Sequence, residues 1–236
     1  MIPIHLEQLE FRYPQSDFLL KIEQLTIDAG SRVAIVGPSG SGKTTLLNLM
    51  AGICRAQQGR IQIGEHSVGE MSDSERRNFR ISRIGMVFQQ FELVDYLNTE
   101  ENILLPFAIN QSISPTGEDR QYAESLAVQM GLGDKLRRLP NRLSQGEQQR
   151  VAICRALVTR PSLIFADEPT GNLDPKNKTR ILDILFDINR EQGQTLVVVT
   201  HDTQILDGFE RIIDFQDFTV EANTDSQTDR MLEKRS

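Results

Sequence analysis

The chain has 236 residues, of which 39% are hydrophobic and 25% charged, a composition that is typical of a folded globular domain and excludes a disordered or fibrous chain. Its formal net charge of -7 argues against nucleic acid as a partner, because an acidic surface repels the phosphate backbone. The sequence has neither a basic start followed by an apolar run nor a stretch of about 18 apolar residues, so we expect no secretory signal and no membrane-spanning helix.

The first part of the chain predicts a small antiparallel β layer followed by a buried strand. Apolar residues alternate along 4–11 and 19–27, on either side of a Tyr-Pro turn, which is typical of paired strands. The run Arg32–Val36 is short, apolar and rich in β-branched residues, and it ends in a glycine-rich turn. Apolar side chains at helical spacing follow over 46–53, so this turn joins a strand to a helix.

The middle of the chain changes from strands to helices. Strands are predicted over 60–64 and 84–88, with a polar surface helix over 71–82 between them. From Gln89 the pattern is helical, and we expect helices over 98–110, 119–130 and 144–158, with a loop over 111–117 that is marked by Ser, Pro and Gly.

The last part of the chain returns to the α/β pattern. A continuous apolar run over 163–166 predicts a parallel strand that is covered on both faces. A helix over 176–191, a strand over 195–200 and a last pair of strands over 212–220 would complete the core, and the polar tail over 221–236 is expected to be flexible. The sequence therefore predicts an α/β fold in which a helical lobe interrupts a core with a mixed sheet.

One segment fits the phosphate-loop pattern, and it lies between the predicted strand and the predicted helix, as that pattern requires. Its backbone N–H groups would surround the β-phosphate, Lys43 would reach the outer phosphates, and the Thr44 hydroxyl would bind Mg²⁺. Thr45 is a candidate contact of the α-phosphate. The candidate nucleotide-binding residues of this loop are Gly37, Pro38, Ser39, Gly40, Ser41, Gly42, Lys43, Thr44 and Thr45.

Two acidic residues close the apolar strand over 163–166. Asp167 would hold the Mg²⁺ shell through water, while Glu168 points elsewhere and could orient and deprotonate the attacking water. The plainer interpretation of Glu168 is a cap on the next turn. These two motifs predict a P-loop nucleotide hydrolase, and they leave kinases and helicases open.

The segment 143–153, with the sequence LSQGEQQRVAI, narrows the choice. It resembles the signature motif of the ABC ATPases and the helix that follows it, and it precedes the acidic strand in the order that this family requires. Over nearly its whole length the chain is similar to an ABC transporter nucleotide-binding subunit. The resemblance implies one ATPase domain over 1–220, with a core over 1–88 and 160–220 and a helical subdomain over 89–159.

Four further positions match this family, and three of them, the Q-loop, the D-loop and the switch histidine, follow in chain order. Gln89 matches the Q-loop glutamine, also a candidate Mg²⁺ ligand, and Asp174 in the segment 171–174 matches the D-loop. His201 follows a β-branched strand and matches the switch histidine, a γ-phosphate sensor. Tyr13 lies where the family has an aromatic residue that stacks on adenine, although Phe11 nearby competes for this role and a packing role also stays open.

The signature departs from the usual Leu-Ser-Gly-Gly-Gln of the family at Gln145 and Glu147. Ser144 and Gly146 are kept, and the resemblance implies that they donate hydrogen bonds to the γ-phosphate of ATP held by the opposite subunit. Glu147 also completes a capping box with Ser144, which stabilises a helix start by about 1 kcal/mol. Its carboxylate would repel the partner's polyphosphate, so we hypothesise a weaker ATP-driven pairing than in relatives with glutamine.

The resemblance implies ATP and Mg²⁺ as cofactors, a homodimer of ATPase subunits, and a separate membrane permease that the chain serves from the cytoplasm, peripherally on the inner face of the cell membrane. The segments 87–94, 101–106 and 169–174 resemble the subgroup of lipoprotein-release, macrolide-export and cell-division ATPases, whose partners carry large external domains. This subgroup implies export or mechanical transmission across the membrane. A regulator of cell-wall cleavage that acts through a permease-like partner stays open as the alternative.

Overall fold

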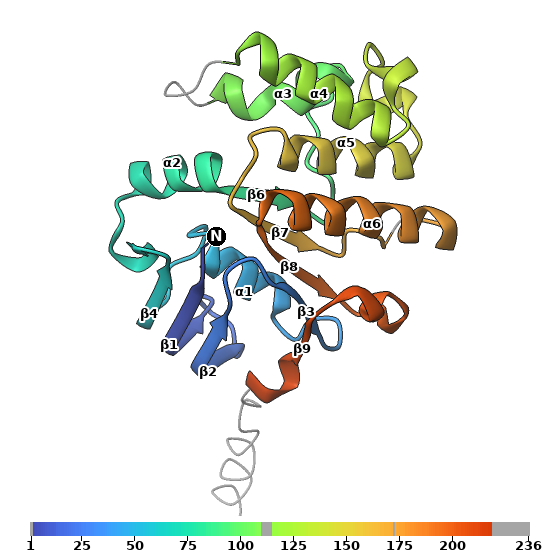
Figure 1. Cartoon of the computed structure of the whole chain (residues 1–236). Helices are drawn as coiled ribbons and strands as arrows, with labels where there is room; N and C mark the ends of the chain where they lie inside the picture. Colours follow the sequence, from blue (N-terminus) through green and yellow to red (C-terminus); the bar gives the residue numbers. More distant parts are fainter. Residues whose placement is uncertain (1, 110–114, 172, 219–236) are drawn as a thin grey trace, which may run out of the picture.

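The computed structural model describes residues 2–109, 115–171 and 173–218. Two sheets form the scaffold of the fold (Figure 1). The first has four strands in the order β2-β1-β4-β5, all paired antiparallel. Its strands are β1 (Ile4–Arg12), β2 (Leu19–Ile27), β4 (Gln58–Ile63) and β5 (His66–Ser67). The expected β layer is thus confirmed, and the short β5 extends it.

The second sheet has five strands in the order β6-β7-β8-β3-β9, and every recorded pairing in it is parallel. Its strands are β6 (Ile84–Val87), β7 (Leu163–Asp167), β8 (Thr195–Thr200), β3 (Arg32–Val36) and β9 (Arg211–Asp214). The strands of a parallel sheet end at the same edge, so the residues that follow β6, β7, β8 and β3 lie along one edge of this sheet.

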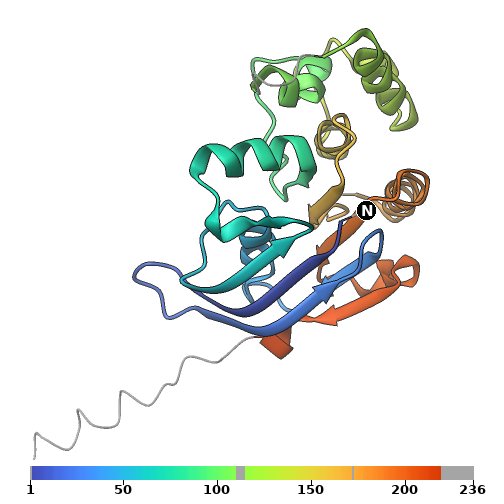
Figure 2. The same ribbon diagram turned by 60° about the vertical axis from the view of Figure 1, so that its left-hand side comes forward.

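The helices separate into those that pack on the sheets and those that form a lobe at one end of the molecule. Helix α1 lies between the two sheets, whereas α3 and α4 are grouped at the far end with α5 between them and the parallel sheet (Figures 1 and 2). The helices are α1 (Lys43–Met50), α2 (Asp73–Arg83), α3 (Thr99–Ile109), α4 (Gly117–Gln129), α5 (Gln145–Leu157) and α6 (Pro175–Gln192). None of the described helices is long and apolar enough to cross a membrane.

The parallel strands are buried on both faces, which explains their continuous apolar runs. Along β7, Leu163 and Phe165 face the cluster around α1, while Ile164 and Ala166 face the cluster that contains α5 and α6. Strand β8 alternates in the same way. The side-chain period of two therefore divides one apolar run between two cores.

Three expectations need correction or fall outside the described residues. The pair of strands expected over 212–220 is one strand, β9, which pairs with β3 and is followed by a 3₁₀ turn, Phe215–Phe218. The Phe215 ring is fully buried against the core around α1, so the chain turns inward there. Part of the expected loop over 111–117, and the tail over 221–236, lie outside the described residues.

Candidate active site

The phosphate-loop segment forms a tight turn between β3 and α1. Gly42 is the N-cap residue of α1 and has a φ of 105°, a backbone conformation that residues other than glycine rarely adopt. A Cβ atom at this position would also collide with the ring of Phe18. The first N–H groups of α1 have no side-chain cap, so they are available to an anion at the positive end of the helix dipole.

Lys43 closes this turn. Its Nζ donates to the carbonyl oxygens of Gly37 at 2.9 Å and Pro38 at 2.8 Å, and the residue is buried. Burial lowers the pKa of the Lys43 ammonium, and the nearby carboxylates of Glu168 and Asp167 oppose this change. A phosphate group in the turn would offer the ammonium a charged acceptor, which forms stronger hydrogen bonds than a carbonyl does.

The Thr44 hydroxyl and Asp167 meet at the edge of the sheet. Thr44 Oγ1 donates to Asp167 Oδ2 at 2.6 Å. Burial raises the pKa of the Asp167 carboxyl, and the hydrogen bond from Thr44 opposes this rise. A hydroxyl and a carboxylate oxygen at this spacing fit Mg²⁺, which takes oxygen ligands and usually keeps waters and substrate phosphates in its shell. The described residues contain no group of three or more His, Cys, Asp or Glu side chains that could hold a metal ion, so phosphates, water or an amide oxygen would have to supply the remaining ligands.

Glu168 and His201 form a second pair of interacting side chains at the site. Glu168 follows β7 with a φ of 49°, and its Oε1 accepts from the backbone N–H of His201 at 3.0 Å and lies 2.6 Å from His201 Nδ1. Thr200 Oγ1 donates to the other carboxylate oxygen at 3.2 Å. The parallel pairing of β7 with β8 brings these residues together, although they are far apart in the sequence.

Gln89 lies just beyond the carboxyl end of β6, the neighbour of β7, and is exposed. Two residues later the backbone takes an unusual course, because Phe91 and Glu92 have φ angles of 57° and 49°. Left-handed conformations of residues other than glycine cost on the order of 1–3 kcal/mol each and persist only where surrounding contacts hold them. The loop after Gln89 is therefore held in place by contacts with its surroundings.

Tyr13 contacts the helix of the phosphate loop. Its hydroxyl lies 3.0 Å from Thr45 Oγ1, and its ring meets Phe11 edge to face at 4.8 Å between centroids and Phe18 at 5.9 Å. Phe11 is buried and Tyr13 is 38% exposed. Of the two candidates for adenine stacking, Tyr13 is the ring that solvent reaches.

The signature segment begins α5 and lies apart from this cluster. Ser144 and Glu147 form the expected capping box, with Ser144 N donating to Glu147 Oε2 at 2.7 Å and Glu147 N donating to Ser144 Oγ at 3.3 Å. Gln145 is exposed, and a Cβ at Gly146 would lie 3.1 Å from the Leu173 side chain. Among the described residues, no hydrogen bond joins this segment to the phosphate loop.

Asp174 is the N-cap residue of α6. Its carboxylate accepts from Asn177 N at 3.2 Å and from Asn177 Nδ2 at 2.5 Å. These hydrogen bonds lower the pKa of Asp174. The capping role and the D-loop role suggested by the sequence are compatible, because the cap fixes the turn that precedes α6.

Glu147 also has a cationic partner. Lys135 Nζ lies 3.6 Å from Glu147 Oε1. Burial raises the pKa of the Glu147 carboxyl, but the hydrogen bonds from Ser144 and the charges of Lys135 and Arg150 outweigh it, so the net change is downward. The carboxylate stays charged, and Lys135 reduces the field that it would exert on a nearby phosphate.

The replacement Glu147→Gln tests what remains of that field. We expect the ATP-bound dimer to dissociate about 1.4- to fivefold less readily, since a partly exposed and paired charge contributes about 0.2–1 kcal/mol. The dimer dissociation constant would be measured by sedimentation in a chain that also carries Glu168→Gln. An unchanged or weaker dimer would contradict a repulsive role of Glu147, and Glu191→Gln is the control at an exposed position.

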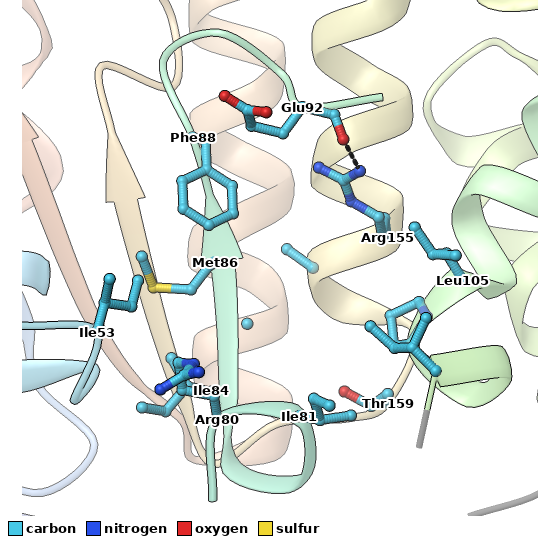
Figure 3. A pocket seen from close by; sticks show the side chains of 14 residues that line it. Ile53, Arg80, Ile81, Ile84, Met86, Phe88, Glu92, Leu105, Arg155 and Thr159 are labelled. Atoms are coloured by element: carbon cyan, nitrogen blue, oxygen red, sulfur yellow. Dashed lines mark hydrogen bonds between the residues drawn. The ribbon is translucent and has the colours of Figure 1, made fainter. Parts of the chain in front are cut away.

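An apolar groove of about 270 Å³ separates the core from the helical lobe. Side chains of α2, β6, α3 and α5 line it, including Met86, Leu105 and Pro106 (Figure 3). Two isoleucines at its margin are solvent-exposed, Ile109 at 61% and Ile53 at 44%. Contiguous exposed apolar surface marks contacts with other proteins, which makes this groove a candidate contact.

Sequence reasoning missed three features of the site. Phe18 packs on Gly42 from a polar loop, Thr200 binds Glu168, and Arg155 of α5 binds the loop that follows Gln89. Each contact joins residues that are far apart in the sequence, so local patterns do not predict it. The sequence shows only that Phe18 is an apolar residue in a polar loop and that Arg155 is a charged residue in an apolar stretch of helix.

Comparisons with known proteins agree with this geometry. A family model described as ABC transporter matches residues 20–171. The chain is 44% identical over 182 residues to the ABC transporter ATP-binding protein YbbA of Escherichia coli, which covers 77% of this chain and 79% of YbbA. It is 39% identical over 218 residues to the macrolide export ATP-binding/permease protein MacB of Rhodopirellula baltica, which covers 92% of this chain and 32% of MacB.

A solved structure shows the same fold. The dimer of the ATP-binding cassette MJ0796 bound to ADP and Pi matches with a TM-score of 0.83 at 38% identity, over 89% of this chain and 93% of the MJ0796 chain.

Proposed function

The chain belongs to the ABC transporter family of ATP-binding proteins and hydrolyses ATP, and from this premise we propose that two copies enclose two molecules of Mg-ATP to drive a separate membrane permease. One observation carries the proposal. The ends of parallel strands gather Lys43, Thr44, Asp167, Glu168 and His201 at one site, while Ser144 begins a helix that makes no hydrogen bond to that site among the described residues. A second copy that faces the first would bring Ser144 to the nucleotide.

The residues of the site have distinct proposed roles. Lys43 and the N–H groups of its loop bind the phosphates, and Thr44 with Asp167, through water, holds Mg²⁺, which neutralises phosphate charge when bound. Gln89 would complete the shell of the ion. Tyr13 stacks on adenine.

Glu168 is proposed as the general base. Its carboxylate is buried and is held by Thr200 and His201, which fixes its direction. A water hydrogen-bonded to this carboxylate would lose its proton to Glu168 as it attacks the γ-phosphate. The side chain of His201 is 61% exposed, and its outer nitrogen would donate to that phosphate when the imidazole carries a proton on both nitrogens.

The groove between the core and the lobe is the proposed permease contact. Its lining is mostly apolar, it lies beside the loop that follows Gln89, and two exposed isoleucines lie at its margin. The name of the relative MacB joins an ATP-binding part to a permease, and 92% of this chain matches MacB. These features support a subunit of an exporter, or of a lipoprotein-release or mechanical transmission system. We propose that its permease is a separate chain with a large external domain. The subunit would work at the inner face of the membrane.

The groove can be tested with a charge at its edge. Ile109→Asp places a carboxylate in the apolar contact, and we expect at least a tenfold loss of affinity for the membrane permease, because burial of an unpaired charge costs several kcal/mol. Val128→Asp is the matched control, since Val128 is 60% exposed on α4 and is not among the residues that line the groove.

Binding would be measured by co-purification in detergent, with thermal melting of both variants as the folding control. If the unaltered chain binds no permease, the proposed function is wrong. If Ile109→Asp binds as tightly as the control, the groove is not the contact.

A further inference from the structure

Arg155 joins the signature helix to the loop that follows Gln89. It lies in the last turn of α5, the helix that begins after Ser144. Its guanidinium donates to two successive carbonyl oxygens, from Nη2 to Phe91 at 2.5 Å and from Nη1 to Glu92. Figure 3 shows the bond to Glu92. The residue is only 8% exposed, so these contacts are made away from solvent.

The two carbonyls belong to Phe91 and Glu92, the residues of this loop that have left-handed backbone conformations. A planar guanidinium presents its N–H groups in a fixed fork. This fork fits the two carbonyls, because the left-handed backbone of the loop turns both of them toward Arg155. Among the described residues no carboxylate lies within ion-pair distance of Arg155, so the guanidinium binds main-chain atoms and is not half of a salt bridge.

A second buried side chain holds the far end of the same loop. Asn102 of α3 is fully buried, accepts from Val94 N at 2.8 Å and donates to Val94 O at 3.1 Å and to Leu97 O at 2.8 Å. The segment from Phe91 to Leu97 is therefore fixed to α5 at one end and to α3 at the other. Gln89 lies just before this segment and is exposed, so its position depends on how the segment is held.

We propose that Arg155 is a positioning residue for ATP hydrolysis: by fixing the loop to the signature helix, it sets the place of Gln89 in the Mg²⁺ site. When the helical lobe moves, the loop and Gln89 move with α5. Because Arg155 and Glu92 also line the apolar groove, an occupant of the groove presses on the same contact. The inference depends on the proposed role of Gln89, but the free chain suffices to test it.

The test compares Arg155→Lys and Arg155→Met with the unaltered chain. Lysine keeps the charge and methionine removes it, but neither can donate to both carbonyls as the guanidinium does. Both variants should therefore lower kcat at least tenfold, while the KM for ATP changes less than threefold. Hydrogen exchange at amides 91–97 should become at least tenfold faster. Arg180→Lys and Arg180→Met are the matched controls, since Arg180 of α6 also donates to a main-chain carbonyl of the helical lobe, that of Gln129, and they should change neither quantity.

A double variant separates positioning from a general loss of stability. If Arg155 acts through Gln89, Gln89→Ala together with Arg155→Met should be no slower than the slower single variant. The proposal would be overturned if the decreases in kcat of the two single variants multiply in the double variant. It would also be overturned by a normal kcat in Arg155→Lys, by unchanged hydrogen exchange at amides 91–97, or by a normal kcat in Gln89→Ala. Arg155→Lys keeps the test valid if Arg155→Met does not fold. Failure of the chain to bind a permease bears only on the proposed function.

Discussion

Replacing Glu168 by Gln should lower steady-state ATP hydrolysis at least a hundredfold, because a general base contributes about 10²–10⁴ to the rate. The amide keeps the size of the side chain and can still meet Thr200 and His201, but it cannot take a proton from water. ATP binding should remain, since Lys43 and the loop N–H groups are unchanged. Phosphate release would be measured against Glu191→Gln, a control at an exposed position.

The contrary result is equally clear. If Glu168→Gln retains more than about a tenth of the normal turnover, Glu168 is not the base. Its contacts with His201 and Thr200 would then serve only to fix the turn after β7, which is the capping role that the sequence left open.

Replacing Lys43 by Ala should weaken ATP binding about ten- to a hundredfold, since a charge-assisted hydrogen bond contributes about 1.5–3 kcal/mol. The loss should be greater for ATP than for adenosine, because the proposed contacts of the lysine with the nucleotide are with its phosphates alone. Calorimetric titration of both ligands would show this. Lys21→Ala is the control, since Lys21 lies on β2 and pairs with Glu10 at 3.6 Å, and unchanged ATP affinity in Lys43→Ala would contradict the proposed phosphate site.

Local sequence patterns predicted those parts of the fold whose causes are local. The runs that became β3, β7 and β8 are continuous and apolar because each strand is buried on both faces. The capping box at Ser144 and the turn at Gly42 were also visible, since each depends on residues close in the chain. The prediction of a last pair of strands was wrong because the chain forms a 3₁₀ turn after β9, where Phe215 packs into the core.

The parts of the site that could not be predicted depend on strand order and on loops. The contact of Glu168 with His201 follows from the adjacency of β7 and β8, which the sequence does not state. The loop after Gln89 has left-handed residues without glycine, so no turn signal marks it, and its course depends on Arg155 and Asn102 from two other helices. Motif residues were thus predictable from the sequence, whereas the side chains that position them were not.

The molar mass of Glu168→Gln in Mg-ATP, measured by light scattering, tests most directly whether each nucleotide lies between two chains. We predict a dimer that holds two nucleotides and that reverts to monomers when Ser144→Arg is added, because the arginine would block the helix start that faces the partner's phosphate. A chain that binds Mg-ATP but stays monomeric, even with its membrane partner present, would contradict the shared site.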